Sequence, residues 1–218
     1  MKLKLNQTEY WSNAANKKKF NHEIEWGLLN SLITKNTKIL DYGCGYGRLT
    51  NNAFENGYTN VIGIDNSNGM IEQANTNFPN LFFSQNTSEK IDFPDKHFDL
   101  ILLFTVLTCI PLESDQKQLI KELNRILKPN GILYVSDLLI NSDQRNINRY
   151  DSSHQKPYGV FKHNEGVILR HHAKNYLDET IFKNFNILNE KTFEVITMNG
   201  NKSKAIQLIG RKNNQPSV

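Results

Sequence analysis

Short apolar runs, rich in β-branched and aromatic residues, alternate with longer stretches of helical period along most of the chain. We expect strands at residues 38–41, 61–65, 81–84, 98–104 and 132–137. Strands that alternate with helices predict a parallel sheet wrapped by helices, and nearly continuous apolar runs are typical of strands buried on both faces. The expected fold class is therefore α/β, with an open doubly wound sheet whose ligand site lies at the carboxyl ends of the strands.

The remaining segments predict a packing helix, an insertion and a closing hairpin. Apolar residues at helical spacing follow Ser114, a plausible N-cap, and residues 129–131 (Pro-Asn-Gly) predict the helix end. Residues 141–164 are polar, rich in asparagine and weakly periodic, which predicts a loop or partial helix inserted after the fifth strand. A helical segment at 173–185 precedes two β-like runs, 191–197 and 205–210, whose connecting Asn-Gly predicts an antiparallel hairpin.

Composition limits the classes of protein that need to be considered. The 218 residues are 38% hydrophobic, which suits one α/β domain, and the net charge of +4 is too evenly spread to predict a nucleic-acid surface. Cys44 and Cys109 lie far apart without zinc-type spacing, so neither a disulfide nor a metal site is expected. The chain lacks a signal-peptide pattern and a long apolar run, which predicts a cytoplasmic protein without membrane association.

The stretch ILDYGCGYGRLT places Gly43, Gly45 and Gly47 directly after an apolar run. These glycines serve either a tight structural turn or a loop that lets a ligand lie against main-chain N–H groups. A dinucleotide fingerprint would place its third glycine at the position of Arg48. Because Asp41 would repel a pyrophosphate and attract an ammonium group, the loop favours a ligand with a cationic amino-acid part.

Asp65 ends the second expected strand, at about the separation from the glycine loop that a ribose-binding acid has in nucleotide-binding folds. A carboxylate in this place is suited to accept hydrogen bonds from both ribose hydroxyls. The alternative is that Asp65 caps the following helix, a role that Ser67 would fill equally well.

Four segments together resemble the successive motifs of class I S-adenosylmethionine-dependent methyltransferases. They are DYGCGYG, GIDNSNGMIEQA, FDLILLFTVLTCI and LNRILKPNGILYVSD, and the resemblance covers roughly residues 36–140. It implies a Rossmann-like, three-layer α/β/α fold with a mostly parallel seven-stranded sheet and an antiparallel last strand. We expect a single domain over 1–212, with an N-terminal helical lid (1–35), a cofactor-binding core (36–140), a substrate-cap insertion (141–170) and a C-terminal helix and hairpin (171–212), followed by a loose tail (213–218).

The resemblance also implies S-adenosylmethionine as cofactor, with S-adenosylhomocysteine as product, and a role for each matching residue. Asp41 would bind the methionine ammonium group and Asp65 the ribose hydroxyls, while Met70 would pack on the adenine or simply in the helix core. Asn86 would accept a bond from the adenine amino group. The complete set of expected cofactor-binding residues is Asp41, Gly43, Cys44, Gly45, Gly47, Asp65, Asn66, Met70, Asn86, Phe104 and Thr105, the last two lying beside the sulfonium.

A sulfonium methyl group is already activated, so the protein has to align a nucleophile, exclude water and remove a proton where one is present. We expect the helix that begins at 170–172 to lie near the methyl group, with His171 or His172 as a general base or as a packed helix-start residue. Arg170 is expected to bind a substrate carboxylate or phosphate, or else to form a salt bridge.

Three more residues are candidates for substrate contact, each with a structural alternative. Asn199 lies at a turn that returns to the same face, although turn geometry alone explains an Asn-Gly pair. Tyr10 and Trp11 are expected to close over the site as an aromatic lid, or to anchor an N-terminal helix in the core.

The leading hypothesis is methyl transfer by in-line displacement to an O or N atom of a small molecule, by a monomer or homodimer with no metal and no nucleic-acid partner. A nucleic-acid or protein substrate is the lesser enzymatic alternative. From another class, a catalytically silent cofactor-binding regulator also fits the intact glycine and acidic positions. A nicotinamide oxidoreductase is disfavoured by Arg48.

Overall fold

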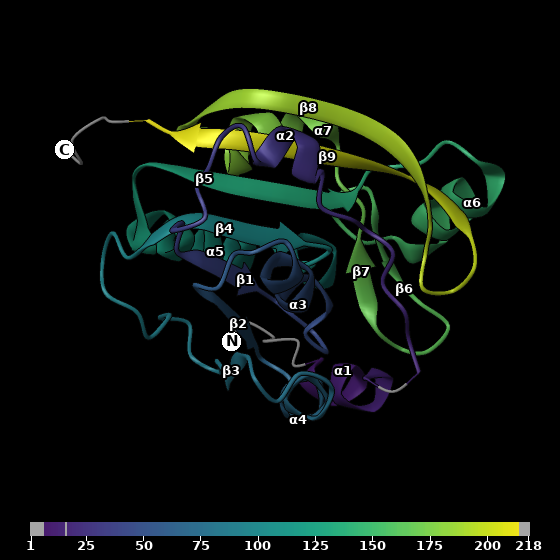
Figure 1. The fold of residues 1–218 in the computed structure, drawn as a ribbon. Helices are drawn as coiled ribbons and strands as arrows, with labels where there is room; N and C mark the ends of the chain where they lie inside the picture. The colour runs from purple at the N-terminus through teal and green to yellow at the C-terminus, as the bar shows by residue number, and fades with distance from the viewer. Residues whose placement is uncertain (1–6, 16, 214–218) are drawn as a thin grey trace.

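The computed structural model describes residues 7–15 and 17–213, which form a seven-stranded sheet with helices on both sides and a separate two-stranded hairpin (Figure 1). The elements follow one another in the order α1 (Thr8–Ala14), α2 (Trp26–Leu29), β1 (Ile39–Tyr42), α3 (Arg48–Glu55), β2 (Val61–Asp65), α4 (Asn68–Asn77), β3 (Phe82–Gln85), β4 (Phe98–Phe104), η1 (Leu107–Cys109), α5 (Glu113–Ile126), β5 (Leu127–Leu138), α6 (Gln144–Ser153), β6 (Val160–Lys162), β7 (Ile168–Arg170), α7 (Lys174–Tyr176), η2 (Leu177–Ile181), β8 (Phe185–Ile196) and β9 (Lys202–Lys212).

The sheet has the strand order β3-β2-β1-β4-β5-β9-β8. The first five strands pair in parallel, and β9 runs antiparallel to both β5 and β8. The predicted α/β fold, with seven strands and a reversed last strand, is therefore confirmed. The order changes direction between β1 and β4, and in open α/β sheets such a switch point places a ligand crevice at the carboxyl ends of the strands.

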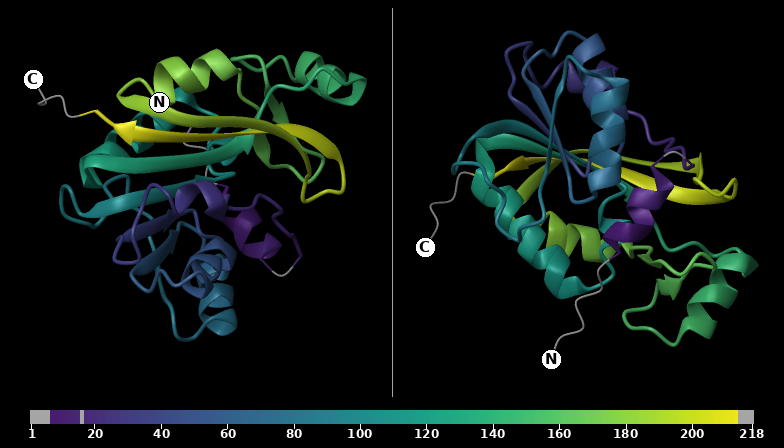
Figure 2. Two further views of the ribbon diagram at one scale, coloured as in Figure 1. Left: turned by 45° about the horizontal axis from the view of Figure 1, so that its top comes forward. Right: turned by 90° about the horizontal axis from the view of Figure 1, so that it is seen from below.

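Two apolar layers cover the two faces of the sheet, and alternate residues of each strand belong to different layers. In β4, Ile101 and Leu103 pack against α5 and η2, whereas Leu100 and Leu102 pack against α2 and α3. Figure 2 shows α5 and α7 on the opposite side of the sheet from α3. Because both faces are covered, the strands need apolar residues at every position, as their sequences predict.

Several element boundaries differ from the sequence prediction. Helix α5 begins at Glu113 rather than after Ser114, with Leu112 at the N-cap position and no side-chain cap. Strand β5 begins at Leu127, where a register shift lets it pair with Phe98, and the two hairpin strands β8 and β9 extend beyond the predicted runs. The helix expected at 173–185 is reduced to the short α7 and the π-helical turn η2.

The insertion is more ordered in structure than the sequence predicted. It contains helix α6, which Asp143 caps by accepting from Asn146 N–H, and the β6–β7 hairpin. These elements project from one end of the sheet, beside the β8–β9 turn (Figure 1). At the C-terminus Asn213 donates its backbone N–H to Asn184, while the remainder of the predicted loose tail, 214–218, lies outside the described residues, as do residues 1–6 of the predicted lid.

Candidate active site

Two cavities meet at the carboxyl ends of the parallel strands. The larger one, here the cofactor cavity, has a volume of about 1090 Å³ and is lined by the glycine loop and by the ends of β1, β2 and β4. The smaller one, here the acceptor cavity, has a volume of about 270 Å³ and is lined by the chain after α1, by α6, by the β6–β7 hairpin and by the β8–β9 turn. Both cavities share Trp11, Phe20, Thr105 and Cys109, so these four residues form the junction.

The three loop glycines serve different purposes. All three have a positive φ, but a Cβ on Gly43 would lie 2.4 Å from Val106 Cγ2 and one on Gly47 would lie 2.7 Å from the Phe83 ring. A Cβ on Gly45 would meet only ordinary contacts, at 3.7 Å or more, and this residue borders the cofactor cavity. Gly43 and Gly47 are therefore needed for close packing within the structure, whereas Gly45 leaves room at the cofactor cavity.

Asp65 ties the ends of β1 and β2 together at the cofactor cavity. Its Oδ2 accepts the Gly45 N–H at 3.0 Å and its Oδ1 accepts the Ser67 N–H at 2.9 Å. Ser67 caps α4 by accepting from Met70 N–H. The helix cap is therefore Ser67 and not Asp65. Burial raises the pKa of Asp65, and these backbone donors oppose that rise because they favour the ionised form.

Asp41 is 1% exposed and lines the same cavity. Its Oδ2 accepts a hydrogen bond from Thr50 Oγ1 at 2.7 Å. Burial raises the pKa of Asp41 to about 6, while the Thr50 hydrogen bond and the nearby Arg48 guanidinium hold it down. A buried carboxylate of this kind gains most from a cation placed beside it.

The expected adenine side of the cavity is formed by α4 and the segment after β3. Met70 is 2% exposed, packs with Ala14 and Ala15 of the α1 region, and borders the cavity. The backbone N–H of Asn86 donates to Asp65 O at 2.8 Å, and Asn86 lines the cavity together with Asn66. Cys44 also lines it, and burial raises the pKa of its thiol well above the ordinary value, so the thiol stays protonated.

Thr105 occupies the junction in a backbone conformation that β-branched residues rarely adopt. Its φ is +55°, its N–H donates to Ser136 O at 2.7 Å, and its carbonyl accepts from Cys109 Sγ at 3.1 Å. Backbone strain of this kind costs about 1–3 kcal/mol and concentrates at functional sites. Thr105 directly follows Phe104, the last residue of β4, and lies where the two cavities meet.

The acceptor cavity has the opposite charge character to the cofactor cavity. Arg145, Arg149 and Lys162 line the acceptor cavity, and no Asp or Glu from residues 7–15 and 17–213 does so. The cofactor cavity is instead lined by four carboxylates and one cation among the same residues, namely Asp41, Asp65, Glu89, Asp115 and Arg48.

His171 is the expected catalytic histidine that borders the acceptor cavity. Its Nδ1 lies 2.6 Å from Tyr150 Oη, and Arg149 Nη2 donates to its Nε2 at 3.4 Å. Because Arg149 can only donate, His171 Nε2 accepts and the ring proton belongs on Nδ1. Burial first and Arg149 second lower the pKa of His171 well below the ordinary value, so the imidazole is neutral at pH 7.

The residues of the cofactor cavity fit S-adenosylmethionine. Asp41 and Asp65 supply carboxylates for an ammonium group and for ribose hydroxyls, and Gly45 leaves room for a ligand against the loop backbone. Across the described residues, no group of three or more His, Cys, Asp or Glu side chains is placed to hold a metal ion.

Comparison with known proteins gives the family. A family model described as a methyltransferase domain matches residues 33–190, which is more than half of the chain. The chain belongs to this methyltransferase-domain family. The cofactor of this methyltransferase domain is S-adenosylmethionine, in agreement with the fit of the cofactor cavity.

Individual relatives span a range of acceptors. A solved S-adenosylmethionine-dependent methyltransferase from Methanosarcina mazei superposes with a TM-score of 0.81 at 25% identity, covering 86% of this chain and 98% of that one. A ubiquinone biosynthesis O-methyltransferase of Pelagibacter ubique is 34% identical over 48% of this chain and 43% of its own length. The eEF1A lysine and N-terminal methyltransferase of Homo sapiens is 27% identical over 48% of this chain and 16% of its own length. The chain spans about half the length, or less, of the curated relatives it matches.

His172 lines neither cavity and is packed in the interior, which fits the packing alternative rather than the role of a base. His172 is 0% exposed, accepts from Gln116 Nε2 at 2.9 Å and lies 3.8 Å from the buried carboxylate of Asp137. Burial lowers its pKa to about 3, which keeps it neutral within the core. The reason is that β7 carries the chain to this point in extended form, so adjacent side chains face opposite sides.

Arg170 also lines neither cavity, which fits its salt-bridge alternative rather than a contact with substrate. Its guanidinium stacks over Tyr176, with 4.1 Å between Cζ and the ring centroid, and pairs with Glu113 at 3.7 Å. The salt-bridge alternative therefore describes Arg170.

Asn199 and Trp11 line the acceptor cavity. Tyr10 does not line it and packs edge-on against the Trp11 ring. Asn199 Oδ1 accepts from Lys18 Nζ at 2.7 Å, and Lys18 pairs with Glu165 at 2.7 Å. Tyr10 Oη donates to the same Glu165 carboxylate at 2.6 Å. These bonds join the chain after α1, the β6–β7 hairpin and the β8–β9 turn around one rim.

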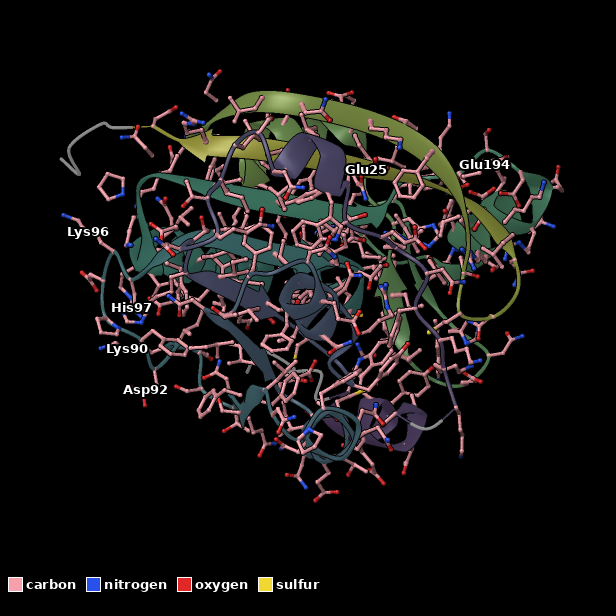
Figure 3. All side chains as sticks on the ribbon, in the orientation of Figure 1. Glu25, Lys90, Asp92, Lys96, His97 and Glu194 are labelled. Carbon is pink, nitrogen blue, oxygen red and sulfur yellow. The ribbon has the colours of Figure 1, made fainter. Side chains whose placement is uncertain are left out.

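Sequence reasoning missed two acceptor-cavity residues, His22 and Arg149. His22 Nδ1 lies 2.7 Å from Ser136 Oγ, and burial lowers the His22 pKa to about 4. Arg149 lies on the buried side of α6, against Phe161. Neither residue belongs to a motif, and residues 144–153, in which only Ile147 and Tyr150 are apolar, gave no signal that singled out Arg149. His97 lies with Lys90 and Lys96 at an edge of the molecule remote from α6 (Figure 3).

Proposed function

We propose that this domain transfers the methyl group of S-adenosylmethionine to a small molecule held in the acceptor cavity. The observation that carries the proposal is the junction, where Trp11, Phe20, Thr105 and Cys109 border both cavities. A cofactor that fills the larger cavity and an acceptor that fills the smaller one would meet there. Holding two reactants at such a junction is itself a large part of catalysis for an activated methyl donor.

When bound, the cofactor supplies a sulfonium methyl group that an attacking O or N atom can displace. In this proposal Asp65 and Asp41 bind the ribose and ammonium portions, and Gly45 lies against the cofactor. Phe104 and Thr105 set the depth of the cofactor at the end of β4, and the aromatic rings of Trp11 and Phe20 exclude water from the junction.

His171 is proposed to position the Arg149 guanidinium at the acceptor cavity, because its Nε2 already accepts from Arg149 and its Nδ1 proton faces Tyr150. The adjacent Arg149 disfavours imidazolium, which makes His171 a weak base. An acceptor that is already deprotonated, or that loses its proton to water after transfer, suits this environment better than one that needs a strong base.

A small acceptor is favoured by the size and closure of the acceptor cavity. A volume of about 270 Å³ suits a compact molecule. The bonds of Lys18 with Glu165 and Asn199 tie together the three segments that surround it. The human relative that is named for lysine and N-terminal methylation favours a second candidate, transfer to a protein. To admit a protein, the segments joined by Lys18 would have to separate.

The test begins with calorimetric titration of the purified protein with S-adenosylhomocysteine, using Asp65→Asn as the control. Protein that carries methyl-labelled S-adenosylmethionine is then incubated with a cell extract divided by ultrafiltration into small molecules and macromolecules. Label in the small-molecule fraction supports the proposal, and label in the macromolecular fraction supports the second candidate. Product binding with no label in either fraction would support a silent cofactor-binding protein instead.

A further inference from the structure

The charges that line the acceptor cavity are unbalanced. Arg145, Arg149 and Lys162 are cationic, and the three histidines that line the cavity, His22, His163 and His171, all have pKa values lowered by burial. No described carboxylate lines this cavity. Three acidic residues close to the cavity are already engaged. Asp137 accepts the Thr108 and Leu138 N–H groups, Glu165 pairs with Lys18, and Asp143 pairs with Arg145.

Arg149 is the most buried of these three cations. Its guanidinium lies over the Phe161 ring, with 3.9 Å between Cζ and the ring centroid, and Tyr150 lies beside it. Its Nη2 donates to His171 Nε2 at 3.4 Å, whereas its Nε is buried without a hydrogen-bond partner.

Three other arginines form ion pairs with carboxylates. Arg125 bonds Glu122 and Asp95 at 2.8 Å, Arg170 lies 3.7 Å from Glu113, and Arg145 lies 3.6 Å from Asp143. Among the described residues Arg149 forms no ion pair with a carboxylate, and its fixed partners are aromatic rings and a neutral imidazole. A partly buried guanidinium with an unused donor gains strongly when an anion supplies the missing acceptor.

We propose that the acceptor carries an anionic group, a carboxylate or a phosphate, that binds to Arg149 within the acceptor cavity. This inference rests on the proposed function, because it assigns the chemistry of the molecule that occupies the acceptor cavity. The Phe161 ring holds the guanidinium plane in one orientation, so its fork of donors is preorganised for a planar or tetrahedral anion. Lys162 and Arg145, both exposed, add longer-range attraction for the same charge.

The structure also predicts a ranking of the cations. Replacing Arg149 removes the buried donor itself, whereas replacing Arg145 removes an exposed group that Asp143 already partly neutralises. Anion affinity is therefore expected to fall by at least tenfold in Arg149→Gln and by two- to threefold in Arg145→Gln. Arg149→Lys keeps the charge but loses the planar fork, and is expected to lie between them.

The probes are benzoate, phenyl phosphate and benzamide, each titrated calorimetrically into the protein saturated with S-adenosylhomocysteine. Benzoate and benzamide have nearly the same shape and differ in charge. Comparison of phenyl phosphate with benzoate shows whether the site prefers a phosphate or a carboxylate. Tighter binding of either anion than of benzamide, lost in Arg149→Gln and retained in the surface control Lys121→Gln, is the expected result. The S-adenosylhomocysteine affinity of Arg149→Gln is expected to stay within twofold of the wild type, which also shows that the variant folds.

Equal binding of benzamide and both anions, or anion binding that survives in Arg149→Gln and Arg149→Lys, would overturn the inference. Failure of the wild-type protein to bind S-adenosylhomocysteine would instead overturn the proposed function. Methylation of neutral acceptors alone in the extract experiment would leave the proposed function intact and contradict the anionic acceptor.

Discussion

The two cavities of this methyltransferase domain share a wall and carry opposite charge. Carboxylates of the strand ends, Asp41 and Asp65, line the cofactor cavity, while Arg149 and its cationic neighbours line the acceptor cavity. The acidic set comes from the sheet itself, and the basic set comes from the inserted α6 and β6–β7 hairpin. From this difference we propose that the core selects the cofactor, which carries an ammonium group, and that the insertion selects the acceptor.

The largest effect is expected for Asp65→Asn. It retains the size of the side chain but removes the charge that we propose accepts both ribose hydroxyls, so affinity for S-adenosylhomocysteine should fall by about 100-fold. Calorimetry measures the change, with Asp92→Asn as a matched control, because Asp92 is exposed at an edge of the molecule (Figure 3) and does not line the cofactor cavity. Unchanged affinity in Asp65→Asn would remove the charge argument for the cofactor cavity.

The glycine loop offers a paired test of structure against ligand binding. Gly43→Ala should lower the free energy of unfolding by about 2–4 kcal/mol, because its Cβ would lie 2.4 Å from Val106 Cγ2. Gly45→Ala should cost only about 1–2 kcal/mol, for its positive φ, and should weaken cofactor binding by about tenfold. Thermal melting and product titration of both variants separate these roles. Equal behaviour of the two variants would contradict the division of roles within the loop.

The pH dependence of cofactor binding should follow Asp41, whose pKa is raised to about 6. Ionised Asp41 attracts the ammonium group, so lowering the pH through 6 should weaken S-adenosylhomocysteine binding, by about tenfold between pH 7 and 5. In the free protein the same carboxyl stabilises the fold most below its ordinary pKa of 3.8, and this contribution is lost as the pH rises through 6. Asp41→Asn should flatten both profiles, and a binding profile that stays steep in this variant would assign the titration to another group.

The smallest effect on binding is expected for His172→Gln, which should change the affinity for cofactor and for the anionic probes by less than twofold. Because His172 is fully buried against Gln116, the melting temperature should nevertheless fall. His171→Gln should instead weaken anion binding several-fold, since it alters the contact with Arg149. A strong loss of anion binding in His172→Gln would place this residue at the cavity after all.

Much of the fold follows from local patterns. The central parallel strands were recognisable because burial on both faces requires nearly continuous apolar residues, as in Phe98–Phe104. The antiparallel hairpin followed from its Asn-Gly turn, although not its full length. Helix α5 was located correctly but its start was not, because the helix has no side-chain cap and the expected Ser114 lies inside it.

Most of the expected cofactor residues could be named from the sequence because they lie at the carboxyl ends of strands or directly after them, where position along the chain fixes position in space. The acceptor side had no such rule. Adjacent positions in the extended segment at 170–172 face opposite ways, so His171 lines the acceptor cavity while Arg170 and His172 pack in the interior. Arg149 depended on how α6 docks against Phe161, which no motif encodes.

By itself the sequence determined the sheet, the glycine loop and the acidic strand ends, because periodicity and turn chemistry act between residues that are close along the chain. Only the tertiary structure decided the acceptor cavity. Its walls come from segments around residues 11–22, 105–109, 145–171 and 197–201, and its charge exists only where those segments meet. Contacts between distant segments depend on the packing of the whole domain, so the selectivity that we propose for an anionic acceptor is a property of the fold.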